Sequence, residues 1–176
     1  PKVMKKKKML KLCGAKLKLV DALPYKNPGN YIRYSETLAK SIVNEHGVLW
    51  ANQFDNLSNK KSHYLTTGPE IYKQLSQKVD AFICSIGTGG TISGVSDFLK
   101  EKNKNIVIGL ADPMGSAMYN FYKNGKLKST GSSITEGIGQ GRITRNLENT
   151  VIDESFQITD TEALNIVYEM VRKEGL

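Results

Sequence analysis

The sequence predicts an α/β fold, in which helices pack around a mainly parallel sheet. Two short apolar runs, Val79–Ile86 and Ile106–Ala111, are typical of buried strands. Segments with apolar residues at helical spacing stand between and after these runs, and glycine-rich turns join strand to helix. Ligands of such sheets bind beyond the carboxyl ends of the strands. We therefore expect a site in the turns that follow the strands.

The first part of the chain contains two helix patterns and two short strand patterns. Met4–Cys13 predicts a helix that stops at Gly14, a residue suited to a helix C-terminus. Leu17–Val20 predicts a short strand. Tyr31–Glu45 has apolar residues on one face and predicts an amphipathic helix. Val48–Ala51 predicts a second strand.

The middle of the chain begins with a polar turn and leads into the first buried strand. Gln53–Asn59 is rich in asparagine and predicts a turn region. Thr66–Leu75 predicts a helical segment, in which Thr67 and Glu70 have the spacing of a capping box. The strand at Val79–Ile86 then follows.

The rest of the chain continues the alternation and ends in a capped helix. Thr159 and Glu162 form a second capping box, and Gly175 would end the helix that they begin. The elements expected before it are a helix at Thr91–Lys102, a strand at Ile106–Ala111 closed by a turn at Asp112-Pro113, a helix at Gly115–Tyr122, and a glycine-rich loop at Gly131–Gly141.

Composition narrows the class of protein. A hydrophobic content of 39% is enough for a core, and no run approaches the eighteen or so apolar residues of a membrane span. The net charge of +8 comes mainly from scattered lysines, which favours a solvated surface over a nucleic-acid partner. The two cysteines, Cys13 and Cys84, and the two histidines are isolated, so we expect no disulfide framework, no metal site and a cytoplasmic protein.

The glycine-rich stretch Ser85–Gly94 predicts a phosphate site between a strand and a helix. Its backbone amides and the hydroxyls of Thr88 and Thr91 can converge on an anion at a helix N-terminus. A Walker A loop requires a lysine where Gly90 stands. A dinucleotide fingerprint requires a third glycine where Ile92 stands.

Three interpretations of this stretch remain. The dinucleotide reading is weakened but keeps some support, because Gly94 lies close to the missing glycine and Asp112 follows the next strand. A tight turn that binds nothing is also possible. A small phosphorylated cofactor, held by amides and hydroxyls alone, fits the residues best.

Four motifs in register extend this interpretation. Together they resemble the cysteine synthase (O-acetylserine sulfhydrylase) family of fold-type II pyridoxal-phosphate enzymes, over nearly the whole chain from Met4 to Leu176. In chain order the motifs are Asn52–Asn59, His63–Tyr72, Gly87–Thr91 and Gly131–Gly141.

The resemblance implies a fold and a set of site residues. The fold is a three-layer αβα architecture like that of the tryptophan synthase β-subunit, with residues 1–50 in the smaller domain and 51–176 in the larger, cofactor-binding domain. Gln53 would bind the substrate carboxylate, and Gly137 would line the cofactor. The residues that would hold the phosphate of pyridoxal 5′-phosphate are Gly87, Thr88, Gly89, Gly90 and Thr91.

The resemblance also implies a reaction and partners. The reaction is β-replacement, in which sulfide displaces acetate from O-acetyl-L-serine to give L-cysteine. The family's enzymes are homodimers, and a serine acetyltransferase is a further expected partner. No nucleic acid and no membrane is expected.

Three features of the family are missing from the chain, one of which is the asparagine-bearing Thr-Ser-Gly-Asn-Thr type loop that contacts the cofactor and the substrate. The family's Ser-x-Lys-Asp-Arg type motif, which carries the Schiff-base lysine, does not occur, and neither does the later serine that bonds the pyridine nitrogen. We therefore assign no catalytic residue and expect a segment truncated at both ends, inactive and poorly stable alone. The alternatives are a non-catalytic remnant or binding module of a truncated gene and, third, an NAD-binding domain built on Gly87–Ile92 and Asp112.

Overall fold

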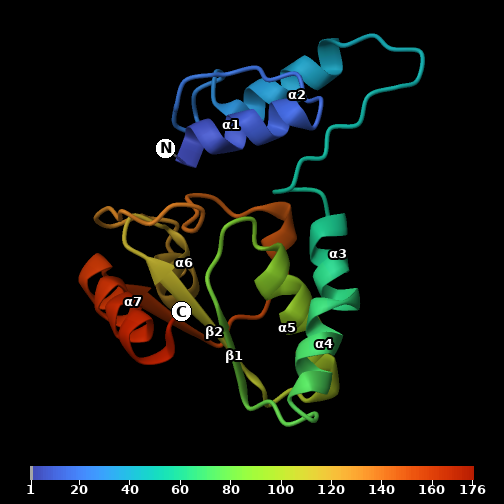
Figure 1. The fold of residues 1–176 in the computed structure, drawn as a ribbon. Coiled ribbons are helices and arrows are strands. Elements are labelled where there is room, and N and C mark those ends of the chain that lie inside the picture. The colour runs from blue at the N-terminus through green and yellow to red at the C-terminus, as the bar shows by residue number, and fades with distance from the viewer. Residues whose placement is uncertain (1) are drawn as a thin grey trace. The chain divides into compact units, whose positions relative to one another are not determined.

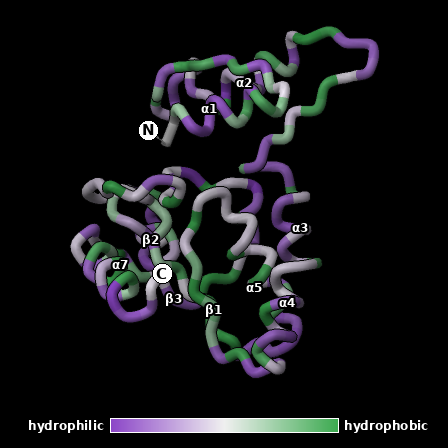
Figure 2. The backbone as a smooth tube through the Cα atoms, in the orientation of Figure 1, coloured by the Kyte–Doolittle hydropathy of each residue, from purple (hydrophilic) through white to green (hydrophobic). Residues whose placement is uncertain are grey.

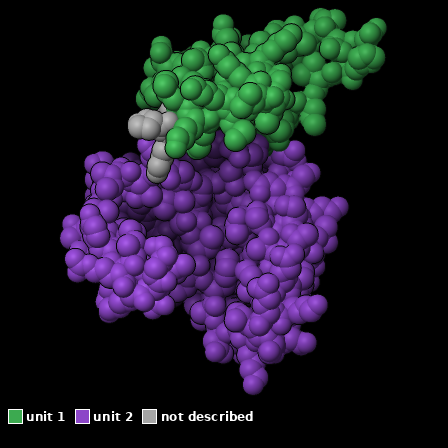
Figure 3. Space-filling view, viewed as in Figure 1, with its two compact units in different colours: residues 1–52 green, residues 53–176 purple. Residues whose placement is uncertain are grey.

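The computed structural model describes residues 2–176 and divides the chain into two compact units, residues 1–52 and 53–176 (Figure 3). Each unit is considered by itself. The assignment of residues 1–50 to the family's smaller domain and of 51–176 to its larger domain stays a prediction. Within the described part of the chain, no helix is both long and apolar enough to cross a membrane.

The first unit consists of two helices joined and followed by irregular chain. Helix α1 spans Lys2–Leu12, and α2 spans Tyr31–Ser41. The side chain of Asn30 caps α2, because its Oδ1 accepts a hydrogen bond of 3.1 Å from the amide of Ile32. Helix α2 ends earlier than predicted, because Ile42 is already extended.

Two predicted strands do not form in the first unit. Leu17–Val20 and Val48–Ala51 are both irregular. A strand is stable only beside another strand, and the described part of this unit contains none. Large apolar side chains in these two segments also remain exposed: Leu49 keeps 90% of its surface accessible to solvent and Leu19 keeps 63%.

The second unit is built on a parallel sheet of three strands, in the order β1-β2-β3 (Figure 1). The strands are β1 (Ala81–Cys84), β2 (Val107–Pro113) and β3 (Glu154–Ile158). Ala81 of β1 pairs with Val107 of β2, and Gly109 of β2 pairs with Glu154 of β3. The predicted parallel α/β fold is confirmed.

Helices precede, connect and follow these strands. α5 lies between β1 and β2, and α6 lies between β2 and β3. In chain order the helices are α3 (Ser58–Leu65), α4 (Thr67–Gln74), α5 (Gly90–Lys102), α6 (Met118–Asn124), the short 3-10 helix η1 (Arg145–Leu147) and α7 (Asp160–Glu174).

The core of the second unit lies between β2 and the helices that flank it. Ile108 and Leu110 of β2 are fully buried, and both point to the same face because side chains alternate along a strand. Hydrophobic residues follow one another along β1 (Figure 2). On the other face, Ile83 and Phe156 remain about half exposed. The core residues contributed by the helices include Ile92, Val95 and Leu99 of α5 and Met118 of α6.

Three local predictions for the second unit are wrong. Thr67 does not begin a capping box: α3 runs almost directly into α4, so Thr66 takes the N-cap position without a side-chain bond. Strand β2 continues through Asp112 and Pro113, where a turn was predicted, because both pair with β3. Ser58 and Asn59, predicted to belong to a polar turn, already lie in the first turn of α3.

Candidate cofactor-phosphate site

The first glycine loop, Gly87–Thr91, connects the end of β1 to the N-terminus of α5. Gly89 is the N-cap of α5 and has φ +88°, a left-handed conformation that favours glycine. A Cβ at Gly89 would stand 2.5 Å from the Leu147 side chain. The loop therefore requires glycine at this position for both its backbone conformation and its packing.

The amides of this loop are available to an acceptor. Among the residues that the structure describes, the N–H groups of Gly87, Thr88, Gly89 and Thr91 donate to no other atom. Such groups at the start of a 13-residue helix carry the partial positive charge of the helix N-terminus. The arrangement suits an anion with several acceptor oxygens.

The second glycine loop, Gly131–Gly141, lies against the first. The amide of Gly139 donates to the carbonyl of Ile86 at 2.8 Å, and Gln140 Nε2 donates to the carbonyl of Gly87 at 3.2 Å. A Cβ at Gly87 would stand 2.7 Å from the carbonyl oxygen of Gly137. The structure thus brings together Gly87 and Gly137, which are 50 residues apart and were predicted to share a site.

Gln53 is held beside the first glycine loop through its backbone. Its carbonyl accepts hydrogen bonds from Asn59 Nδ2 at 2.8 Å and Asn146 Nδ2 at 2.9 Å. Asn59 Nδ2 also lies 2.9 Å from the hydroxyl of Thr88. The backbone of Gln53 is therefore held close to the loop, while the residue itself is exposed. The role of its side chain toward a substrate carboxylate stays a proposal.

Both threonines of the loop have a side-chain neighbour on α3. Thr88 Oγ1 meets Asn59 Nδ2, as described above, and Thr91 Oγ1 lies 3.1 Å from Nε2 of His63. The other ring nitrogen of His63 lies 2.9 Å from Thr67 Oγ1, which explains why Thr67 does not cap α4. Neither neighbour was assigned to the site from the sequence. Their spacing of four residues would have been the signal, had α3 been predicted.

An ion pair fixes the two segments that flank Asn59 and Asn146. Arg142 binds both carboxylate oxygens of Asp55, at 3.0 and 2.8 Å, and the amide of Arg145 donates to the same carboxylate at 2.9 Å. The hydrogen bonds from the Arg142 guanidinium hold the pKa of Asp55 below its ordinary value. This pair was not predicted.

Asp112 is not placed to bind a ribose. Its side chain is fully buried, and its Oδ2 accepts a hydrogen bond of 2.8 Å from the amide of Tyr119 in α6. Burial raises the pKa of this carboxyl, and its Oδ1 has no partner in the described chain. Asp112 therefore has a structural role, the contact with α6, and does not act as the ribose-binding acid of a dinucleotide site.

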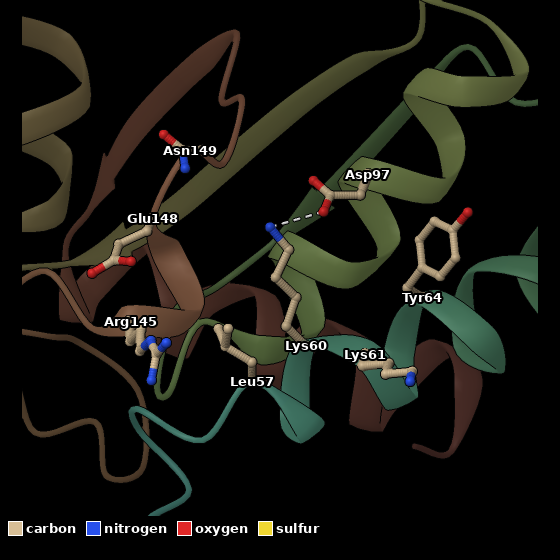
Figure 4. Close-up of a pocket in the computed structure, with 8 residues that line it drawn as sticks. All are labelled: Leu57, Lys60, Lys61, Tyr64, Asp97, Arg145, Glu148 and Asn149. Atoms are coloured by element: carbon tan, nitrogen blue, oxygen red, sulfur yellow. Dashed lines mark ion pairs between the residues drawn. The ribbon is translucent and has the colours of Figure 1, made fainter.

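A pocket of about 450 Å³ lies among α3, α5 and η1, and none of the predicted site residues lines it (Figure 4). Its charges are mixed, and Lys60 Nζ pairs with Asp97 Oδ2 at 2.8 Å. A second pocket, of about 340 Å³, includes Ile138, Gly139 and Gln140 of the second glycine loop. The described residues contain no group of three or more potential metal ligands.

The first glycine loop fits the phosphate of pyridoxal 5′-phosphate. Four unpaired amides and two hydroxyls provide several neutral donors, which match the acceptor oxygens of a dianion. Packing requires glycine at two positions of this loop, because a Cβ at Gly87 would collide with the carbonyl oxygen of Gly137 and one at Gly89 with the side chain of Leu147. The family comparison agrees with this fit: the model of the family described as "Pyridoxal-phosphate dependent enzyme" matches residues 1–176.

The chain belongs to the pyridoxal-phosphate-dependent enzyme family. Among curated relatives, cysteine synthase 1 of Neurospora crassa is 44% identical over 96% of this chain, and cysteine synthase 1 of Emericella nidulans is 43% identical over 96%. The crystal structure of an O-acetylserine-dependent cystathionine β-synthase from Helicobacter pylori superposes with a TM-score of 0.79, at 30% identity over 97% of this chain.

The match covers only part of each relative. The aligned region makes up 45% of the Neurospora protein, 46% of the Emericella protein and 52% of the Helicobacter chain. The chain thus spans about half the length of these family members, and the four sequence motifs all lie in the shared half. The fold-type II resemblance is confirmed, and the non-catalytic and dinucleotide-binding alternatives are not favoured.

Proposed function

We propose that this chain provides the phosphate-binding loop and part of the substrate pocket of a pyridoxal-phosphate-dependent cysteine synthase. The reaction of the whole enzyme would be the replacement of acetate in O-acetyl-L-serine by sulfide, which gives L-cysteine. One observation carries the proposal: four unpaired amides and two threonine hydroxyls belong to the loop that leads into α5, in a chain of this family.

Each group of residues has a separate proposed role. The first glycine loop binds the phosphate through neutral donors and so fixes the cofactor's position. The cofactor, when bound, supplies the electron sink for the chemistry at the substrate's α-carbon. The amide of Gln53 donates to the substrate carboxylate, and Gly137 lines the cofactor because a glycine lets the backbone approach a planar ring closely.

This chain alone is proposed to bind but not to catalyse. None of its 21 lysines stands in the family's lysine motif, and we assign the Schiff-base role to none of them. We also propose that the whole enzyme is a cytoplasmic homodimer that can bind a serine acetyltransferase. These last assignments rest on the family resemblance.

Binding of pyridoxine 5′-phosphate tests the proposal. This probe has the cofactor's ring and phosphate but no aldehyde, so it cannot react with the many surface lysines. Equilibrium dialysis would compare its affinity with that of pyridoxine, which lacks the phosphate. We expect clear preference for the phosphorylated probe, because the amides of Gly87, Thr88, Gly89 and Thr91 have no other partner in the described chain.

Two variants and a control sharpen this test. Thr88→Ala and Thr91→Ala each remove a hydroxyl donor to an anion, which should weaken binding of the phosphorylated probe about tenfold or more. Thr161→Ala changes an exposed threonine of α7 and should have no effect. Equal affinity for the two probes would refute the proposal, and preferential binding of NAD would revive the dinucleotide reading.

A further inference from the structure

We propose that Asn59 and His63 are positioning residues for the phosphate: they orient the hydroxyls of Thr88 and Thr91 so that both donate to the anion. The inference rests on the proposed function, since it concerns the same loop. A threonine hydroxyl can donate or accept, and it helps to bind a phosphate only as a donor. The neighbours of Thr88 and Thr91 decide which of the two each hydroxyl does.

Asn59 fixes the hydroxyl of Thr88. The amide orientation of Asn59 is set by the carbonyl of Gln53, which can only accept, so the atom 2.8 Å away must be Nδ2. The same Nδ2 donates to Thr88 Oγ1 at 2.9 Å, and the amide of Gly90 donates to that oxygen at 3.3 Å. A hydroxyl has two lone pairs and one hydrogen. With two donors on its oxygen, Thr88 has its own hydrogen left to donate.

His63 acts on Thr91 in the same way. A neutral imidazole has one donor and one acceptor nitrogen. When the hydroxyl of Thr67 donates to Nδ1, the hydrogen of His63 is on Nε2 and donates to Thr91 Oγ1, 3.1 Å away. The hydrogen of Thr91 is then free for the anion. In the other tautomer of His63, Nε2 is the acceptor and takes up the hydrogen of Thr91. A bound phosphate therefore favours the tautomer with the hydrogen on Nε2.

The helices hold the two pairs in register. Asn59 and His63 are four residues apart, so they lie on one face of α3. Gly90 and Gly94 are four residues apart on α5 and allow that face to come close. A Cβ at Gly90 would stand 2.0 Å from Asn59 Oδ1, and one at Gly94 would stand 2.8 Å from Cβ of His63. Two rigid helices thus set the distances between the hydroxyls and their neighbours.

The test is a double-mutant cycle on the complete chain. Its readout is the ratio of the affinities for pyridoxine 5′-phosphate and pyridoxine, which a general loss of folded protein would not change. Asn59→Ala should lower this ratio about tenfold, the effect of a hydroxyl that no longer donates to an anion. In a Thr88→Ala background the same change should lower it less than twofold, because the hydroxyl that Asn59 orients is gone.

A second pair of variants covers the case in which Asn59→Ala does not fold. His63→Leu removes both ring nitrogens and should lower the ratio about tenfold, whereas His63→Gln keeps an N–H donor toward Thr91 and should retain most of it. Asn165→Ala, at an exposed position of α7, is the matched control.

Each outcome has one meaning. The inference is supported if Asn59→Ala lowers the affinity ratio in the unmodified chain but not in the Thr88→Ala background. An unchanged ratio, or an equal effect in both backgrounds, overturns it and leaves Asn59 and His63 with a packing role only. If the unmodified chain shows no preference for the phosphorylated probe, the proposed function fails and the inference falls with it.

Discussion

The contact between α3 and α5 depends on Gly94, and replacing this residue by alanine should weaken the fold of the second unit. Gly94 lies inside α5 and is buried. A Cβ there would stand 2.3 Å from the carbonyl oxygen of Lys60, 2.7 Å from the amide nitrogen of Tyr64 and 2.8 Å from Cβ of His63. Two of these three neighbours are backbone atoms of α3, so no side-chain rotation can relieve the collision.

The size of the effect follows from two opposing terms. An ordinary contact begins at 3.4 Å, so α3 would have to move away by about 1 Å at Lys60. Overpacking of this kind costs about 1–3 kcal/mol. Alanine gains about 1 kcal/mol over glycine in a helix interior. Because two of the three collisions are with backbone atoms, we take the upper part of the overpacking range, about 2–3 kcal/mol, and expect Gly94→Ala to lower the free energy of unfolding by about 1–2 kcal/mol.

Urea unfolding followed by circular dichroism measures this change. Gly90→Ala is an informative comparison, since its Cβ would meet only the end of the Asn59 side chain, at 2.0 Å. We expect a small stability loss there but a weakened phosphate site. Gly141→Ala is the control, because nothing lies within 4 Å of its added Cβ. A Gly94→Ala variant as stable as the unmodified chain would refute this account of the helix contact.

Three further predictions concern charge and capping. The pKa of Asp55 is lowered by Arg142, so the stability that this pair contributes is present above about pH 4 and is lost as the pH falls through the lowered pKa. Asp55→Asn should lower the free energy of unfolding by about 1–2 kcal/mol at pH 7 and leave it unchanged in strong acid. An equal loss at both pH values would contradict this. The pKa of Asp112 is raised by burial, so the charged form of this carboxyl opposes folding. The chain should therefore lose stability as the pH rises from about 4 through the raised pKa. Urea unfolding of Asp112→Asn across this pH range should not show that loss, and a pH profile like that of the unmodified chain would contradict the assignment. Thr159 forms a complete capping box with Glu162. Thr159→Ala should reduce the helical circular dichroism signal from α7 and lower the free energy of unfolding by about 1 kcal/mol. A variant with unchanged helicity would show that other contacts stabilise α7.

The strand–loop–helix unit around the first glycine loop could be predicted because its signals are local. The apolar run Val79–Ile86 contains β1, and α5 begins at Gly90, one residue before the predicted start. The capping box at Thr159 also formed as predicted. In each case the residues that determine the structure are close together in the sequence.

The failures occurred where a distant segment decides the local structure. Thr67 has the same capping spacing as Thr159, but His63 of the preceding helix binds its hydroxyl. Val48–Ala51 has strand-forming residues, but the described part of its unit contains no strand with which it could pair. β3, at Glu154–Ile158, was missed because its sequence is not an apolar run, and it is stabilised by pairing with β2.

The site shows the same division. The phosphate-binding role of the first glycine loop could be predicted from its glycines and threonines together with the family resemblance, and it stays a prediction. Asn59 meets Thr88 across 29 residues, and Asp55 meets Arg142 across 87. Helical spacing can place residues such as Asn59 and His63 on one face of a helix, but it does not indicate which distant segment that face contacts.

The central claim is that the amides of the first glycine loop bind the cofactor's phosphate. A ¹H–¹⁵N spectrum of the chain, titrated with pyridoxine 5′-phosphate, tests it most directly. We expect the amide signals of Gly87, Thr88, Gly89 and Thr91 to shift together as the probe binds, and pyridoxine to leave them in place. Shifts confined to other segments, or no shift at all, would contradict the claim.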